Sequence, residues 1–225
     1  MRCDKCTEKP CGGGMACTAC DAAALYADET DRRMMRAASE VEAEYYGEAN
    51  RIQEIIIFSQ KMGYKKLGIA FCAAFSEEAA KLGAILDKYF EIATVNCKVC
   101  GVPKSEMGAM ESDRIGNISC NPIAQAAVLN DAKTDLNILM GLCVGHDVLF
   151  IKYSKAPVVP VAAKDRVLAH NPMGALYCSA IYKRMMKAAY KYAEEHENEA
   201  WPVNSAKAQR VQQKSAASPE APQTE

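Results

Sequence analysis

The sequence predicts a three-layer α/β domain, in which a mostly parallel sheet carries helices on both faces. Two observations predict this class: short apolar runs alternate with segments of helical period, and the run before Gly141 ends at a glycine-containing turn, as buried parallel strands do. A small Cys-rich metal-binding segment is expected over residues 1–27, the α/β domain over 28–200 and a disordered tail over 201–225.

The expected strands are apolar runs too short to be buried helices and bounded by turn residues. They are Leu67–Phe71, Ile92–Asn96, Leu136–Leu142 and Val158–Ala162. Between the second and third runs, the stretch from Val102 to Ser119 has no clean period. We expect it to be a loop that lies as a lid over the edge of the sheet.

The expected helices follow from apolar residues that recur every three or four positions. They run from about Asp31 to Met62, Ser76 to Tyr89, Pro122 to Asp131 and Met173 to His196, with a short helix after Asp147. Ser76, Asn121 and Asp147 are expected N-caps, and Pro122 suits the first helical position. Asn171-Pro172 repeats the same cap-and-first-turn pattern, and Gly63 is a plausible helix stop.

Composition limits the function of the chain. Its 225 residues are half hydrophobic with a net charge of -1, which suits one sizeable core and argues against a broad nucleic-acid surface. No apolar run approaches the roughly 20 residues of a membrane span, and the N-terminus lacks a secretory signal. We therefore expect a cytoplasmic protein, whose 11 cysteines serve as metal ligands or catalytic thiols rather than as disulfides.

Five cysteines crowd the N-terminal twenty residues: Cys3, Cys6, Cys11, Cys17 and Cys20. Two of the spacings are C-x2-C, and such pairs grip one metal from tight turns. The pattern predicts a thiolate metal site, in which four sulfurs gather around zinc, or an iron–sulfur cluster. The alternative, a flexible Cys-rich segment without a metal, stays open.

Further cysteines recur where expected strands end. Cys72, Cys97 and Cys143 each close a strand, Cys120 directly precedes a helix, and Cys100 lies on the turn after Cys97. Parallel strands deliver their carboxyl ends to one edge of a sheet, which is where ligands bind in open α/β folds. We therefore expect these thiols to converge there and to hold zinc or a [4Fe–4S] cluster.

Two histidines lie near this expected site. His146 follows the third strand and is a candidate metal ligand or proton donor, and His170 is a second candidate for moving protons. Alternatives remain, because a buried cysteine often acts as a small hydrophobe; Cys178 is expected to be such core packing. A thioredoxin-like role for the pair Cys97 and Cys100 is disfavoured, since no helix follows it.

Three strings carry a family resemblance: Gly141–Asp147, Cys120–Gln125 and Asp165–Pro172. With the Cys-rich start, they resemble the uncharacterised family known as domain of unknown function 1847 (DUF1847), found mainly in anaerobic bacteria and archaea. The resemblance extends to about Glu197. It implies a metal-binding protein, because family members are labelled as probable metal-binding proteins, and it implies no particular reaction.

Two functions are consistent with these patterns. The first is an enzyme or redox protein whose metal or iron–sulfur centre at the sheet edge takes a small-molecule substrate, such as a sulfur compound or a one-carbon unit. The second is a metal-binding sensor or carrier without turnover, in which the N-terminal cysteines do the work. No nucleic acid or membrane is expected as a partner. A phosphate-binding loop is absent, since Gly12–Gly14 lacks a preceding strand and a following Lys-Ser/Thr.

Overall fold

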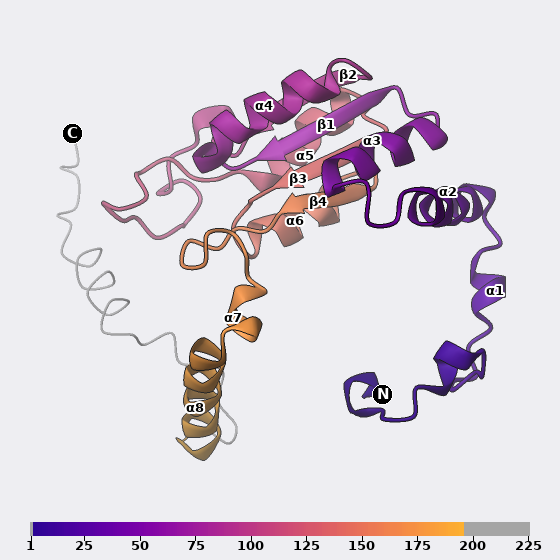
Figure 1. Ribbon diagram of the computed structural model, residues 1–225. Helices are drawn as coiled ribbons and strands as arrows, with labels where there is room; N and C mark the ends of the chain where they lie inside the picture. The colour runs from indigo at the N-terminus through magenta and orange to yellow at the C-terminus, as the bar shows by residue number, and fades with distance from the viewer. Residues whose placement is uncertain (1, 196–225) are drawn as a thin grey trace, which may run out of the picture. The chain divides into compact units, whose positions relative to one another are not determined.

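Four parallel strands form the centre of the fold in the computed structural model, which describes residues 2–195 (Figure 1). They are β1 (Lys66–Phe71), β2 (Glu91–Asn96), β3 (Leu136–Met140) and β4 (Val158–Ala162). Their order is β2-β1-β3-β4, and every neighbouring pair is parallel. The four predicted strands are confirmed, and the sheet they form is parallel throughout. The third strand ends at Met140 rather than at Leu142, so Cys143 lies beyond the strand end that it was expected to close.

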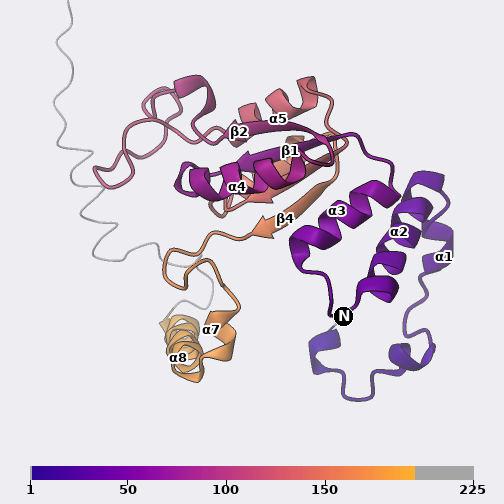
Figure 2. The ribbon, with the colours of Figure 1, turned by 45° about the horizontal axis from the view of Figure 1, so that its top comes forward.

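Helices cover both faces of this sheet. They are α4 (Ser76–Leu86), α5 (Pro122–Asp131) and α6 (His146–Tyr153). The chain moves from β1 outward to β2 through α4 and then back across to β3 through α5. Because crossovers are right-handed, these opposite movements put the two helices on opposite faces, as Figure 2 shows. Since α6 packs beside α5, the predicted three layers are confirmed.

The core of this unit lies around β1 and β3. All five residues of β3 are buried, and Leu67 and Ile69 of β1 are fully enclosed, as expected for strands covered on both faces. The one polar side chain in β3, Asn137, is also fully buried. Its amide oxygen accepts from the Thr134 hydroxyl (2.7 Å) and its amide nitrogen donates to the Ser154 hydroxyl (2.8 Å), so its burial is compensated.

β4 lies at one edge of the sheet and is less regular. Its pairing with β3 shifts register between Leu139 and Met140. Pro160, at the centre of β4, is exposed and brings no backbone N–H to the strand. Edge strands are where sheets tolerate proline.

The described part of the chain forms two compact units, one up to Gly63 and the other from Tyr64. The first holds the Cys-rich segment and helices α1 (Ala22–Leu25), α2 (Glu29–Tyr45) and α3 (Arg51–Lys61). The boundary expected at residue 28 stays a prediction, and the tail expected from residue 201 lies outside the described residues. No helix within residues 2–195 is both long and apolar enough to cross a membrane.

The single long helix expected from Asp31 to Met62 is wrong, because the chain breaks between α2 and α3. Gly47 turns the chain with a φ of +74°, and Asn50 then caps α3 in a reciprocal capping box with Gln53. The two helices share ion pairs of 3.0 Å from Lys61 to Glu40 and Glu44. Each helix carries its own apolar stripe, so periodicity alone could not reveal the turn between them.

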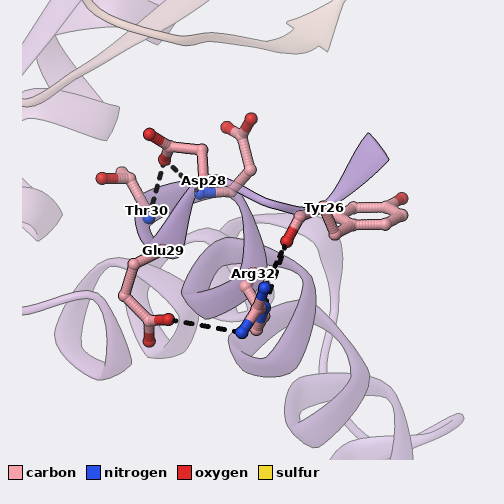
Figure 3. A network of polar contacts seen from close by, with 6 residues as sticks. Tyr26, Asp28, Glu29, Thr30 and Arg32 are labelled. Atoms are coloured by element: carbon pink, nitrogen blue, oxygen red, sulfur yellow. Dashed lines mark hydrogen bonds and ion pairs between the residues drawn. The ribbon is translucent and has the colours of Figure 1, made fainter. Parts of the chain in front are cut away.

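The start of α2 is fixed by local polar contacts (Figure 3). The Asp28 carboxylate accepts hydrogen bonds from the backbone N–H groups of Thr30 (2.8 Å) and Asp31 (3.1 Å), which also lower its pKa. Arg32 donates to the Tyr26 carbonyl (2.9 Å). This N-cap satisfies helix donors that would otherwise lack partners, and it places the helix start ahead of the expected Asp31.

One of the three expected N-caps is confirmed. The Asn121 side chain accepts from the Ala124 N–H (3.1 Å), with proline at the first helical position. Ser76 is itself the first residue of α4, and its hydroxyl donates to the Ala73 carbonyl (2.8 Å). Asp147 lies inside the first turn of α6, because Gly145 precedes that helix. The expected caps at Ser76 and Asp147 are therefore wrong.

The expected final helix is also divided. It forms α7 (Gly174–Tyr177) and α8 (Ser179–Glu195), because Cys178 adopts an extended backbone between them. Met173 precedes α7, so Asn171-Pro172 does not serve as its cap and first turn. Cys178 is exposed, which contradicts its expected role in core packing. Short 3-10 turns complete the elements: η1 (Cys3–Lys5), η2 (Pro10–Gly13), η3 (Ala73–Phe75) and η4 (Val99–Gly101).

We predict that Gly141→Ala destabilises the fold. Gly141 follows β3 with a φ of +64°, and a Cβ there would lie 2.1 Å from the Phe75 ring. The left-handed backbone costs about 1–2 kcal/mol for alanine, and the overlap adds about 1–3 kcal/mol. Gly116→Ala is the matched control, because its φ is +67° with nothing within 4 Å of a Cβ. Equal losses of unfolding free energy in denaturant titrations of both variants would contradict the predicted contact.

Candidate thiol site at the carboxyl edge of the sheet

The backbone brings three of the predicted thiols to one edge of the sheet. Cys72 directly follows β1 and its N–H donates to the Met140 carbonyl (3.1 Å), while Cys97 directly follows β2 and donates to the Phe71 carbonyl (2.9 Å). The Asn121 N–H donates to the Cys97 carbonyl (2.8 Å). This last bond ties the start of α5, and with it Cys120, to the end of β2.

The side chains of these three residues form a chain of sulfur contacts. The Sγ atoms of Cys97 and Cys120 lie 3.7 Å apart, and Cys97 also shares a hydrogen bond with Cys72. The Ala73 N–H donates to the Cys97 sulfur (3.3 Å). Cys97 is buried at 1% exposure and Cys120 is half-buried, so the cluster reaches from the core toward the surface.

Cationic side chains contact the outer thiols. Lys164 donates from its ammonium to the Cys72 sulfur, and the Arg166 guanidinium lies 3.1 Å from the sulfur of Cys143, which follows β3. His146, the first residue of α6, shares a hydrogen bond with Cys120. The lysine ammonium beside the Cys72 sulfur favours its thiolate, as at reactive cysteines generally.

These contacts separate the acidities of the three thiols. The hydrogen bond with Cys97, supported by His146, lowers the pKa of Cys120 to about 3. The hydrogen bond with Cys97 and the ammonium of Lys164 lower the pKa of Cys72 to about 5. Cys97 lies between these two sulfurs and is buried, so its pKa is raised. The arrangement is therefore a buried Cys97 whose neutral form is favoured, flanked by Cys72 and Cys120, whose thiolate forms are favoured.

A compact loop carries the cationic residues. The Asp165 carboxylate accepts from the N–H groups of Val167 (2.8 Å) and Leu168 (2.9 Å). The His170 N–H donates to the Asp165 carbonyl (2.9 Å), and the Asp165 N–H donates to His170 Nδ1 (3.2 Å). The His170 ring also packs on Phe75, with centroids 4.5 Å apart. His170 therefore holds the loop against the segment after β1. Its expected role in moving protons stays a prediction.

Sequence reasoning missed Lys164, Arg166 and Gln125 as parts of this site. The fully buried Gln125 donates from its amide to the carbonyls of Phe71 (3.2 Å) and Val95 (3.0 Å), which joins the ends of β1 and β2 beneath the thiols. Gln125 and Arg166 both lie in the strings that carry the family resemblance, which was the available signal.

Other expected ligands are not drawn together. Cys100 is exposed, and Cys143 bonds to Arg166 rather than joining the contact between Cys97 and Cys120. The N-terminal thiols are all exposed: Cys3, Cys6, Cys11, Cys17 and Cys20. Within residues 2–195, no three His, Cys, Asp or Glu side chains are placed to hold a metal ion. The expected gathering of four N-terminal sulfurs is thus not observed, and metal binding by that segment stays a prediction.

The expected lid is a closed loop. Pro103 and Ile118 form an isolated antiparallel bridge, and the ammonium of the buried Lys104 donates to the Gly116 carbonyl (2.5 Å). Lys98, next to Cys97, donates to the Ile118 carbonyl (2.6 Å). These bonds attach the loop at its base, near the thiols, and its role as a lid stays a prediction.

Fold and site together define an α/β protein with a thiol cluster at the carboxyl edge of a four-stranded parallel sheet. The chain belongs to the family described as "Protein of unknown function (DUF1847)", which matches residues 15–161. It is 42% identical over 191 residues to an uncharacterized protein of Methanocaldococcus jannaschii, a match that covers 83% of this chain and 99% of that protein. No solved structure matches the chain significantly.

We predict that Cys120 reacts as a thiolate in mild acid. Because its folded-state pKa is lowered to about 3, it stays ionised between pH 5 and 8. Iodoacetamide labelling of the chelator-treated protein, followed by mass spectrometry of the Cys120 peptide, should therefore give a nearly constant rate over that range. In the chain unfolded by guanidinium the rate should fall about tenfold per unit below pH 8.5, the ordinary pKa of cysteine. The same steep fall in the folded protein would contradict the stabilised thiolate.

Proposed function

We propose that this protein binds a soft metal centre, either zinc or an iron–sulfur cluster, through the thiols at the carboxyl edge of its sheet. The observation that carries the proposal is the 3.7 Å separation between the sulfurs of Cys97 and Cys120. Two thiolates on one tetrahedral zinc, each with a bond of about 2.3 Å, lie about 3.8 Å apart. The spacing thus fits two ligands of one metal.

The donor set fits this class of metal. Thiolates are the ligands that zinc and iron–sulfur clusters prefer, and the lowered pKa values of Cys72 and Cys120 favour the deprotonated form that binds them. Cys72, Cys97, Cys120 and Cys143 are the proposed ligands. Because no three of the described side chains already form a metal site, Cys72 or Cys143 must turn away from its cation to complete the set.

Neighbouring residues have supporting roles in this proposal. Lys164 and Arg166 offset the negative charge of a thiolate-rich centre, and His146 orients Cys120 through its hydrogen bond. When bound, such a centre supplies a structural crosslink, a Lewis acid or an electron carrier. The chain's own contribution is to gather soft ligands on a rigid edge and to balance their charge.

Turnover of a small sulfur or one-carbon compound at the centre is a second candidate function. One observation favours it over a carrier without turnover: Cys143 is only half-buried and Arg166 is exposed, so this side of the cluster is open to solvent. A purely structural centre would be closed by its ligands.

We predict that protein purified without oxygen contains zinc, or iron and sulfide with visible absorption, and that Cys97→Ser and Cys120→Ser lose it. Mutation of a residue that only hydrogen-bonds to a metal ligand lowers metal affinity about 10–100-fold, so mutation of a ligand itself should lower it at least as much. Cys178→Ser is the control, because Cys178 is an exposed thiol at the end of α7 and does not follow a strand. Elemental mass spectrometry measures the metal content of each variant, and visible absorption spectra report an iron–sulfur cluster.

A second control separates the two groups of cysteines. Replacing Cys3, Cys6, Cys11, Cys17 and Cys20 together with serine removes the N-terminal thiols and leaves the sheet edge intact. If this variant loses all bound metal while Cys97→Ser and Cys120→Ser retain it, the metal belongs to the N-terminal segment and the proposal for the sheet edge fails.

A further inference from the structure

The sheet has a topological switch point between β1 and β3. From β1 the chain continues to β2 on one side, and from β3 it continues to β4 on the other. The segments that follow these two central strands therefore lead to opposite sides of the sheet, and open α/β folds bind ligands at the carboxyl ends of their strands at such a point. Here Cys72 follows β1 on one side of the switch point, and Gly141–Cys143 follow β3 on the other.

The segment after β4 spans both sides of this switch point. Residues 164–170, here called the cationic loop, contact the β1 side through Lys164 and Cys72 and the β3 side through Arg166 and Cys143. Two positive charges thus reach the switch point from the same short loop. The Lys164 ammonium also lies over the Phe75 ring, 5.7 Å from its centre, in a cation–π contact with the segment that follows β1.

The cationic loop is held in a defined shape. Ala169 and His170 have φ values of +50° and +63°, a conformation that costs energy for residues other than glycine. Such strain persists where surrounding contacts fix it; here they are the two hydrogen bonds between Asp165 and His170 and the packing of His170 on Phe75. The loop therefore presents Arg166 and Lys164 from a preformed support.

Within residues 2–195, no carboxylate forms an ion pair with either Lys164 or Arg166. For Lys164 and Arg166, the hydrogen-bond acceptors found within the described part of the chain are sulfur atoms. The nearest acidic residue in sequence, Asp165, directs its carboxylate to the backbone N–H groups of Val167 and Leu168.

We infer that the cationic loop at the switch point binds a small oxyanion, with Lys164 and Arg166 as its counter-charges. The inference deepens the proposed function, on which it rests, by naming the substrate class of the thiol centre: a compact anion such as a carboxylate, a sulfur oxyanion or a phosphate. The guanidinium of arginine matches two oxygens of such an anion, and lysine adds a point charge. The nearby sulfurs then lie beside the bound anion.

The test measures anion binding by the full-length protein purified without oxygen, with its metal content recorded. Acetate, sulfate and phosphate are titrated separately by calorimetry at constant ionic strength, with chloride as the reference. At least one should bind above chloride, and the three arms distinguish the kinds of oxyanion. Arg166→Gln and Lys164→Gln should each weaken binding about tenfold or more, the loss expected for one charge-assisted hydrogen bond.

Matched controls remove cations elsewhere. Arg51→Gln removes a guanidinium from α3, and Lys152→Gln removes an ammonium from the last turn of α6; both should leave the affinity unchanged. Circular dichroism and thermal melts verify the folding of each variant, and Arg166→Lys should retain part of the binding. If none of the anions binds above chloride, or if the controls weaken binding as much as Arg166→Gln, the inference is overturned.

The two proposals fail in different ways. A chain that holds its metal but shows no oxyanion binding refutes the anion site and leaves the metal centre standing. A chain without metal that still binds an oxyanion through Arg166 supports the anion site and refutes the metal centre. The metal content recorded for each sample separates these outcomes.

Discussion

The parallel pairing of β1 with β3 is the constraint on which the candidate site depends. Leu67 pairs with Leu136 and the register runs unbroken to Phe71 and Met140, so the two strands end side by side. Because β3 is buried along its whole length, a slip in register would expose apolar residues or displace them from the core. A slip of two residues would also move the thiols after these strands by about 7 Å relative to one another.

The sheet was predictable because its strands are short, apolar and separated by helical periods, and burial on both faces leaves few alternatives for such runs. Details that depend on local turns were less accessible. The turn at Gly47 lies between two helices with similar patterns, so the sequence reads as one helix across it. Cys178 lies on the surface at the break between α7 and α8, and the apolar period of the sequence does not reveal that break.

The site was predictable only where it follows from the order and direction of the strands. That Cys72 and Cys97 share an edge follows from parallel topology, which any sequence with these strands would obey. Lys164 and Arg166 could not be found in this way, because a charged residue in a loop ordinarily indicates a solvated surface. Their importance comes from contacts with residues 92 and 23 positions away in the chain. The N-terminal spacing, by contrast, is a local pattern, and local patterns do not ensure that side chains meet.

The proline at the centre of β4 has a consequence for how the chain behaves among its own copies. An exposed edge strand offers unpaired backbone groups that can recruit a strand from another molecule and seed aggregation. Pro160 removes a donor from that edge, and the shifted register beside Leu139 disturbs the straight ladder that an incoming strand requires. The side of the sheet from which the loop toward the thiols departs is thus protected against intermolecular β-pairing, both during synthesis and after folding.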